Sequence, residues 1–261
     1  MVFKQEWRSY SKTLLIWAVC VEGLYFVMLL MFPQLRDTMK DVADLYKNMG
    51  AFSEAFGMDK MNIGTVTGFY GTYVGAILSI GGGMFAAMIG TSVLAKEEGG
   101  HTAEYLFTLP YSRKNIVIKK MLAIASIILV FEVVGAAVGL LGVAIVGGEY
   151  SVASLLLFHV GQMCMHLELA SIGILISAYT KRVNVGVGLG IALLMYFLDM
   201  MSRVLDQLKV CKYITPFYYA NASDVLVQEK IDMGLLAVGG VVTVVCLVTA
   251  ITHYNRKDLA A

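Results

Sequence analysis

Six ionisable side chains lie inside long apolar stretches of this chain. They are Glu22, Glu132, His159, His166, Glu168 and Asp199. A charge near the centre of a membrane is costly, so such groups are expected to face a bundle interior, a water-filled path or a partner. Their possible chemistry is proton or cation binding along a transport pathway, or hydrogen bonding between helices. Both interpretations stay open for Glu22 and Glu132, and Asp199 could simply reach the outer interface.

His159, Gln162 and His166 share one face of a helix. This stripe could line a path, or take a metal together with Met163 or Cys164 nearby. Hydrogen bonds between helices are the more ordinary role for such a stripe. We therefore keep the two histidines as pathway candidates and predict no metal site.

A charged segment at residues 97–113 separates two apolar stretches and reads EEGGHTAEYLFTLPYSR. Tyr105, Leu106 and Leu109 would form an apolar patch on a short helix whose other faces carry acids. Pro110 would end that helix, and Ser112 can cap the next one. We expect a small rigid helix at the membrane surface that passes a push from a soluble partner into the membrane. An inert loop is the alternative.

Composition places most of the chain in lipid. The 261 residues are 58% hydrophobic and 15% charged, whereas soluble domains are about 25% charged. Segments long enough to span a membrane occur at 13–32, 70–94, 117–146, 152–179, 184–202 and 233–253. The first is too long for a signal peptide and has no small-residue cleavage site after it. The sequence predicts one all-α membrane domain, 1–261, with six transmembrane helices.

The segments that flank the spans are amphipathic. Phe3, Trp7 and Tyr10 recur at helical spacing opposite basic residues, which predicts an interfacial helix at 1–12. A similar pattern after Pro33 predicts an amphipathic helix in an outer loop, 33–69. A second outer loop covers 203–232, and the polar segment lies in a loop at 95–116.

Lys and Arg are denser on the side that holds both termini and the 95–116 loop, while the acids favour the opposite side. By the positive-inside rule, both termini and that loop are expected in the cytoplasm. Gly135 and Gly139 form a G-x-x-x-G pattern, as do Gly186 and Gly190, which permits close approach of helix backbones within or between chains.

Several enzyme classes lack support. The chain contains no Gly-Lys pair and hence no Walker loop for ATP phosphates. It also lacks an H-E-x-x-H zinc motif, and its four cysteines are far apart with no C-x-x-C pair. No catalytic residue is predicted.

Residues 95–113 resemble the E-x-x-x-G-T-x-E-x-L-L-x-x-P-x-S-R segment of type-2 ATP-binding-cassette (ABC) transporter permeases. Three weaker similarities agree: MFPQL at 31–35, ITPFYY at 214–219 and YNRKDL at 254–259. One departure is His101, where a Gly often precedes the Thr. The resemblance covers essentially the whole chain.

The resemblance implies half of an exporter, with an interfacial N-terminal helix and a cytoplasmic coupling helix between spans two and three. Two permeases, as a homo- or heterodimer, would form the pore, and a separate soluble ATPase would bind ATP and Mg²⁺. It also implies a bacterial cell membrane. The coupling residues would be Glu97, Glu98, Thr102, Glu104, Tyr105, Leu109, Pro110 and Arg113.

Two other functions compete with a permease. An ion-coupled secondary transporter would use Glu22, Glu132, Glu168 or Asp199 as proton or cation sites, although no clear internal repeat is present. An intramembrane enzyme would need a nucleophile–base pair, and none stands out.

Overall fold

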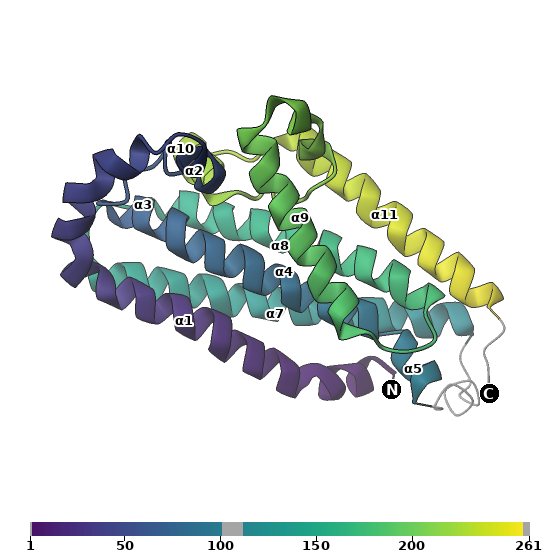
Figure 1. The fold of residues 1–261 in the computed structure, drawn as a ribbon. Helices are drawn as coiled ribbons and strands as arrows, with labels where there is room; N and C mark the ends of the chain where they lie inside the picture. Colours follow the sequence, from purple (N-terminus) through teal and green to yellow (C-terminus); the bar gives the residue numbers. More distant parts are fainter. Residues whose placement is uncertain (1, 101–111, 258–261) are drawn as a thin grey trace.

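A computed structural model describes residues 2–100 and 112–257 as a helical bundle without strands in those ranges (Figure 1). The long helices are α1 (Val2–Lys47), α4 (Gly75–Ser92), α7 (Arg113–Val146), α8 (Val152–Tyr179), α9 (Val185–Val204) and α11 (Met233–Arg256). Short elements join them: α2 (Ala51–Phe56), α3 (Val66–Phe69), the π-helical turn η1 (Tyr70–Val74), α5 (Ala95–Gly99), the 3₁₀ helix η2 (Asp206–Tyr213) and α10 (Ala222–Gln228).

Six helices of the described chain are long and apolar enough to span a membrane, which confirms the predicted number and order. The second span is continuous through α3, η1 and α4 and covers Val66–Ser92. The predicted range 152–179 coincides with α8, and the other ends differ by a few residues, except in α1.

The first span differs most from its predicted form. α1 is one helix of 46 residues and includes both flanks that the sequence separated from the span. Pro33 lies inside α1, where it removes one backbone hydrogen bond, and the last part of α1 turns away from the span direction in Figure 1. The expected 1–12 helix is therefore the first part of α1, with Val2 and Glu6 buried. Its position in a membrane interface stays a prediction.

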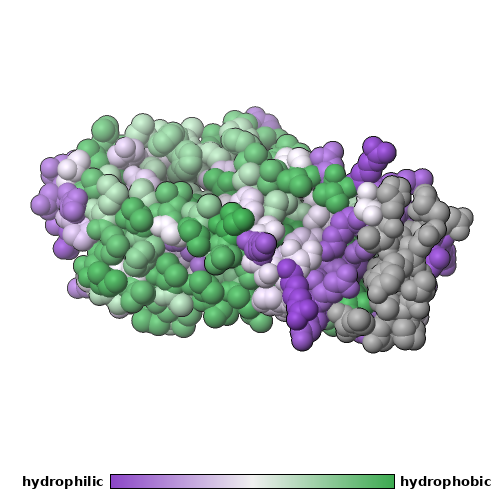
Figure 2. All heavy atoms as spheres, turned by 90° about the horizontal axis from the view of Figure 1, so that it is seen from below, coloured by the Kyte–Doolittle hydropathy of each residue, from purple (hydrophilic) through white to green (hydrophobic). Residues whose placement is uncertain are grey.

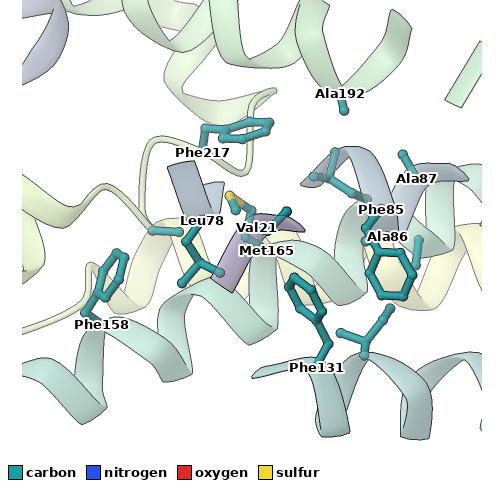
Figure 3. Close-up of a cluster of buried hydrophobic side chains, with 14 of the residues drawn as sticks. Val21, Leu78, Phe85, Ala86, Ala87, Phe131, Phe158, Met165, Ala192 and Phe217 are labelled. Carbon is teal, nitrogen blue, oxygen red and sulfur yellow. The ribbon is translucent and has the colours of Figure 1, made fainter. Parts of the chain in front are cut away.

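The core lies where α4 packs between α8 and α9. A Cβ on Gly90 would lie 3.1 Å from the Cα of Ala170, and one on Gly173 would lie 2.8 Å from the carbonyl oxygen of Ala87. These glycines let the two backbones approach closely. Phe85 and Phe131 pack in the same core with ring centroids 5.0 Å apart (Figure 3).

The outer surface carries an apolar band between two polar ends, which Figure 2 shows from below. Exposed leucine, isoleucine and valine side chains of α1, α7, α9 and α11 contribute to the apolar surface of the molecule. A soluble protein rarely exposes so large an apolar area, whereas lipid covers it without cost. The chain is a multi-pass membrane protein.

The start of α1, the end of α11 and α5 lie at one end of the bundle, named here the terminal end (Figure 1). α2 and α10 lie at the other end, named the loop end. The predicted coupling segment, 97–113, leaves α5 and enters α7 at the terminal end. Its middle part, residues 101–111, lies outside the described residues.

Candidate functional site

Four charged side chains from α1, α5 and α7 form a network at the terminal end. Lys120 Nζ donates to a carboxylate oxygen of Glu6 and, at 2.6 Å, to Glu97 Oε1. Lys96 Nζ donates to the other oxygen of Glu6 at 2.6 Å. Two acids thus face two bases, and the network as a whole is neutral.

Burial makes this network costly to break. The Lys120 side chain is only 1% exposed, and that of Glu6 is 3% exposed. A buried charge that loses its partner costs about 3–5 kcal/mol. Burial lowers the pKa of Lys96, and the neighbouring Glu6 opposes that effect. The network therefore fixes the start of the predicted coupling segment to two long helices.

A second contact fixes the other side of this segment. Lys257 Nζ donates to Glu98 Oε1 at 2.5 Å and to the carbonyl oxygens of Ala178 and Thr180, both at 3.1 Å. These carbonyls belong to the last turn of α8 and its cap, where a cation is favourable. Arg113 Nη1 donates to the carbonyl oxygen of Lys257 at 3.0 Å. Both ends of the segment are thus joined to the C-terminal end of α11.

The structure places three of the predicted coupling residues, Glu97, Glu98 and Arg113, in these contacts. Ser112 caps α7 by accepting a hydrogen bond from the Asn115 N–H, as expected. The other candidates lie outside the described residues: Thr102, Glu104, Tyr105, Leu109 and Pro110. The predicted short helix is therefore untested.

Within the membrane part, Glu132 of α7 lies against two histidines of α8. His166 Nδ1 contacts Glu132 Oε1, and His159 Nδ1 is 3.6 Å from Glu132 Oε2. The hydroxyl of Tyr70, at the start of η1, lies 2.8 Å from His159 Nε2. Glu132, His159 and His166 therefore form one buried cluster with Tyr70. Tyr70 was not singled out from the sequence.

Glu22 and Tyr25 of α1 extend the cluster. The Tyr25 hydroxyl donates to the carbonyl oxygen of Gly135 at 2.5 Å. A Cβ on Gly135 would lie 3.5 Å from Glu22 Oε1, and one on Gly139 would meet the Tyr70 hydroxyl. Within this chain, the G-x-x-x-G pattern of α7 makes room for two tyrosines and a carboxyl group.

Two further polar residues of α8, Gln162 and Glu168, have their hydrogen-bond partners outside the cluster. Gln162 accepts a hydrogen bond from the Ser79 hydroxyl at 3.1 Å and donates to the carbonyl oxygen of Ala220 at 2.7 Å. Glu168 accepts a hydrogen bond from the Tyr219 hydroxyl at 2.9 Å. Glu168 therefore lies apart from the Glu132 cluster, although the two histidines of that cluster are also on α8.

Asp199 belongs to an ion-pair network toward the loop end. Arg203 Nε lies 3.2 Å from both Asp199 oxygens, and Arg203 Nη1 donates to Asp224 Oδ2 at 2.7 Å. Lys60 Nζ donates to the other oxygen of Asp224 at 2.7 Å. Burial raises the pKa of Asp224, but Arg203 and Lys60 outweigh it and hold that pKa below its ordinary value. This network ties the 203–232 loop to α9.

The six pathway candidates therefore fall into three separate places, and whether any of them lines a pathway stays a prediction. Among the described residues, no group of three or more His, Cys, Asp and Glu side chains is arranged to hold a metal ion. Glu6, Lys120 and Lys257 were not singled out from the sequence. The only available signal was that Lys120 lies one turn inside the third span, where a cation needs a partner.

Comparison with known proteins gives the family. Residues 1–259 match the model of the ABC-2 family transporter protein. No curated protein matches the chain. The match covers nearly the whole sequence. The family consists of membrane components of transporters, and the six apolar helices of this chain agree with that. The chain belongs to the ABC-2 transporter family and is a membrane-spanning permease of an ATP-binding-cassette transporter.

Proposed function

We propose that this chain is one half of an exporter pathway driven by a separate ATPase subunit. ATP and Mg²⁺ would bind to that partner, because this sequence has no Walker loop. A second permease, as a homo- or heterodimer, would complete the pathway. Both termini and the 97–113 segment would face the cytoplasm of a bacterial cell.

One observation supports the coupling role most directly. The two described ends of the segment connect to α1, α7, α8 and α11 through ion pairs and hydrogen bonds. A force on residues 101–111 would thus act on four long helices at once. Coupling needs a structural element whose position depends on both the ATPase and the transport pathway. These contacts would connect such an element to the membrane helices.

Co-purification tests the partner. Tagged permease is expected to retain an ABC-type ATPase when the two are expressed together. Glu104→Arg would reverse a charge on the proposed contact surface, so we expect loss of the ATPase from the purified complex. Lys4→Glu is the control, because Lys4 is exposed at the terminal end but lies outside the segment. Retention of the ATPase by the Glu104→Arg variant would contradict this contact surface.

Transport and topology measurements separate the competing functions. Transport into inverted vesicles is expected to need ATP and the ATPase. Transport by the permease alone, driven by a pH gradient, would instead favour the ion-coupled secondary transporter, for which the buried carboxyl groups are the supporting observation. A cysteine placed in 101–111 should resist impermeant thiol reagents in intact cells. Labelling there would overturn the proposed orientation.

A further inference from the structure

Two carboxyl groups and two imidazoles share a buried space between α1, η1, α7 and α8. Glu22, Glu132, His159 and His166 are each at most 4% exposed. Glu132 contacts both histidines, and Glu22 lies beside Gly135, one turn from Glu132 on the same face of α7. The carboxyl groups of Glu22 and Glu132 are close enough to repel each other when both are ionised.

No lysine or arginine is available to balance these carboxylates. The apolar segments around the space, at 13–35, 66–94, 121–146 and 152–179, contain neither residue. The other titratable groups that face the cluster are the hydroxyls of Tyr25 and Tyr70 and the thiol of Cys164. α4 contributes no titratable side chain. Electrical neutrality must therefore come from protons on the cluster itself.

Hydrogen-bonding capacity gives an independent indication. Each of the four cluster residues has one buried atom without a hydrogen-bond partner in the described part of the chain: Glu22 Oε1, Glu132 Oε2, His159 Nδ1 and His166 Nε2. An unpaired ionised oxygen in an apolar interior costs far more than a neutral carboxyl group. Bound protons would therefore neutralise the carboxylates and would supply hydrogen bonds to the unpaired atoms.

Counting charges gives the number of protons. With both carboxyl groups ionised and both imidazoles neutral, the cluster would carry two uncompensated negative charges. Two added protons make it neutral. We propose that Glu22, Glu132, His159 and His166 form a buried proton-binding site that holds two protons in the folded permease. This inference goes beyond the proposed coupling function and needs no partner subunit.

The geometry assigns a place to each proton. In the tautomer with the proton on Nδ1, His159 directs its N–H toward Glu132, and Nε2 accepts the hydrogen bond from the Tyr70 hydroxyl. One bound proton lies in the contact between Glu132 and His166. The other lies on Glu22, the more distant carboxyl group.

Infrared difference spectroscopy on the purified permease at neutral pH tests the assignment. The carbonyl stretch of a protonated carboxylic acid is expected in the wild type and should be lost in Glu22→Gln. In His166→Gln the second proton has no imidazole at that position, so a new carboxylic-acid band from Glu132 should appear. Glu54→Gln, at an exposed position, is the control and should change neither band. Persistence of the first band in Glu22→Gln overturns the proposal.

The pH dependence of unfolding counts the protons independently. Above about pH 7, an unfolded chain has ionised glutamates and neutral histidines, so it binds neither proton. The folded state then binds more protons, and its stability falls as pH rises. Glu22→Gln and Glu132→Gln should each reduce this dependence by one proton, and the double variant by two. Unchanged pH dependence in the double variant contradicts the proposal, even where a single variant folds poorly.

Discussion

Lys120 is the residue on which the terminal-end network depends. It has a hydrogen bond to both acids, Glu6 and Glu97. It also donates to the carbonyl oxygen of Val93 at 3.4 Å. Replacement of a whole network by apolar groups can be neutral, whereas removal of one partner leaves a buried charge unpaired.

Lys120→Met is therefore expected to destabilise the permease by about 3–5 kcal/mol, because it removes the buried cation that Glu6 and Glu97 share. Reversible unfolding in detergent micelles measures this effect. Lys114→Met is the matched control, since Lys114 is exposed near the start of α7 and should change stability by less than about 0.5 kcal/mol. Equal effects of the two substitutions would show that the network contributes little.

From the sequence, the lysines of this network were assigned to the cytoplasmic side, but their partners were not predicted. Lys120 and Lys96 counted toward the positive-inside bias, and Glu6 drew no attention beside the basic residues around it. The reason is physical: a pattern gives the face of one helix, but the partner of a buried charge belongs to another helix. Glu97 and Glu98 were found because a resemblance marked them, not because their partners were visible.

At the scale of elements, apolar length predicted the spans because lipid demands about 20 apolar residues from every crossing helix. Apolar length could not predict that α1 continues through Pro33. A proline ends a helix only when the lost hydrogen bond is not offset, and the packing of Phe32 against Phe69, at 4.8 Å between ring centroids, supplies contacts there. Tertiary contacts decided this boundary.

The G-x-x-x-G patterns separate two roles that the sequence left open. A Cβ on Gly139 would collide with the Tyr70 hydroxyl, whereas nothing lies within 4 Å of one on Gly190. Gly139→Ala is thus expected to destabilise the fold by about 1–3 kcal/mol, through displacement of Tyr70 from His159. Thermal unfolding of the detergent-solubilised permease measures this.

Gly190→Ala is the matched control for Gly139→Ala. It should leave the stability of the single chain unchanged or raise it by up to about 1 kcal/mol, because alanine is the better helix former. If Gly190→Ala instead weakens a permease dimer, the pattern on α9 is a contact between chains. If Gly139→Ala is as stable as the wild type, Tyr70 is not held against Gly139.

At the scale of the whole molecule, the terminal end joins helices that are far apart in the sequence. Glu6 belongs to the start of the chain, Lys120 to α7 and Lys257 to the residue after α11. All three reach the same short stretch, residues 96–98, just before the proposed contact surface. A movement of that stretch would reach both ends of the chain.

Lys257→Met tests whether this connection transmits force rather than only stability. The substitution removes the tie from Glu98 to the end of α8 but leaves the Glu6–Lys120–Glu97 contacts in place. We expect the variant to fold and to retain the ATPase, while substrate transport per ATP hydrolysed falls several-fold. Arg256→Met, at the exposed neighbouring cation, should transport normally. A residue that transmits force must affect transport without affecting ATPase binding. If Lys257→Met reduces ATPase binding and transport equally, Lys257 instead helps to build the contact surface.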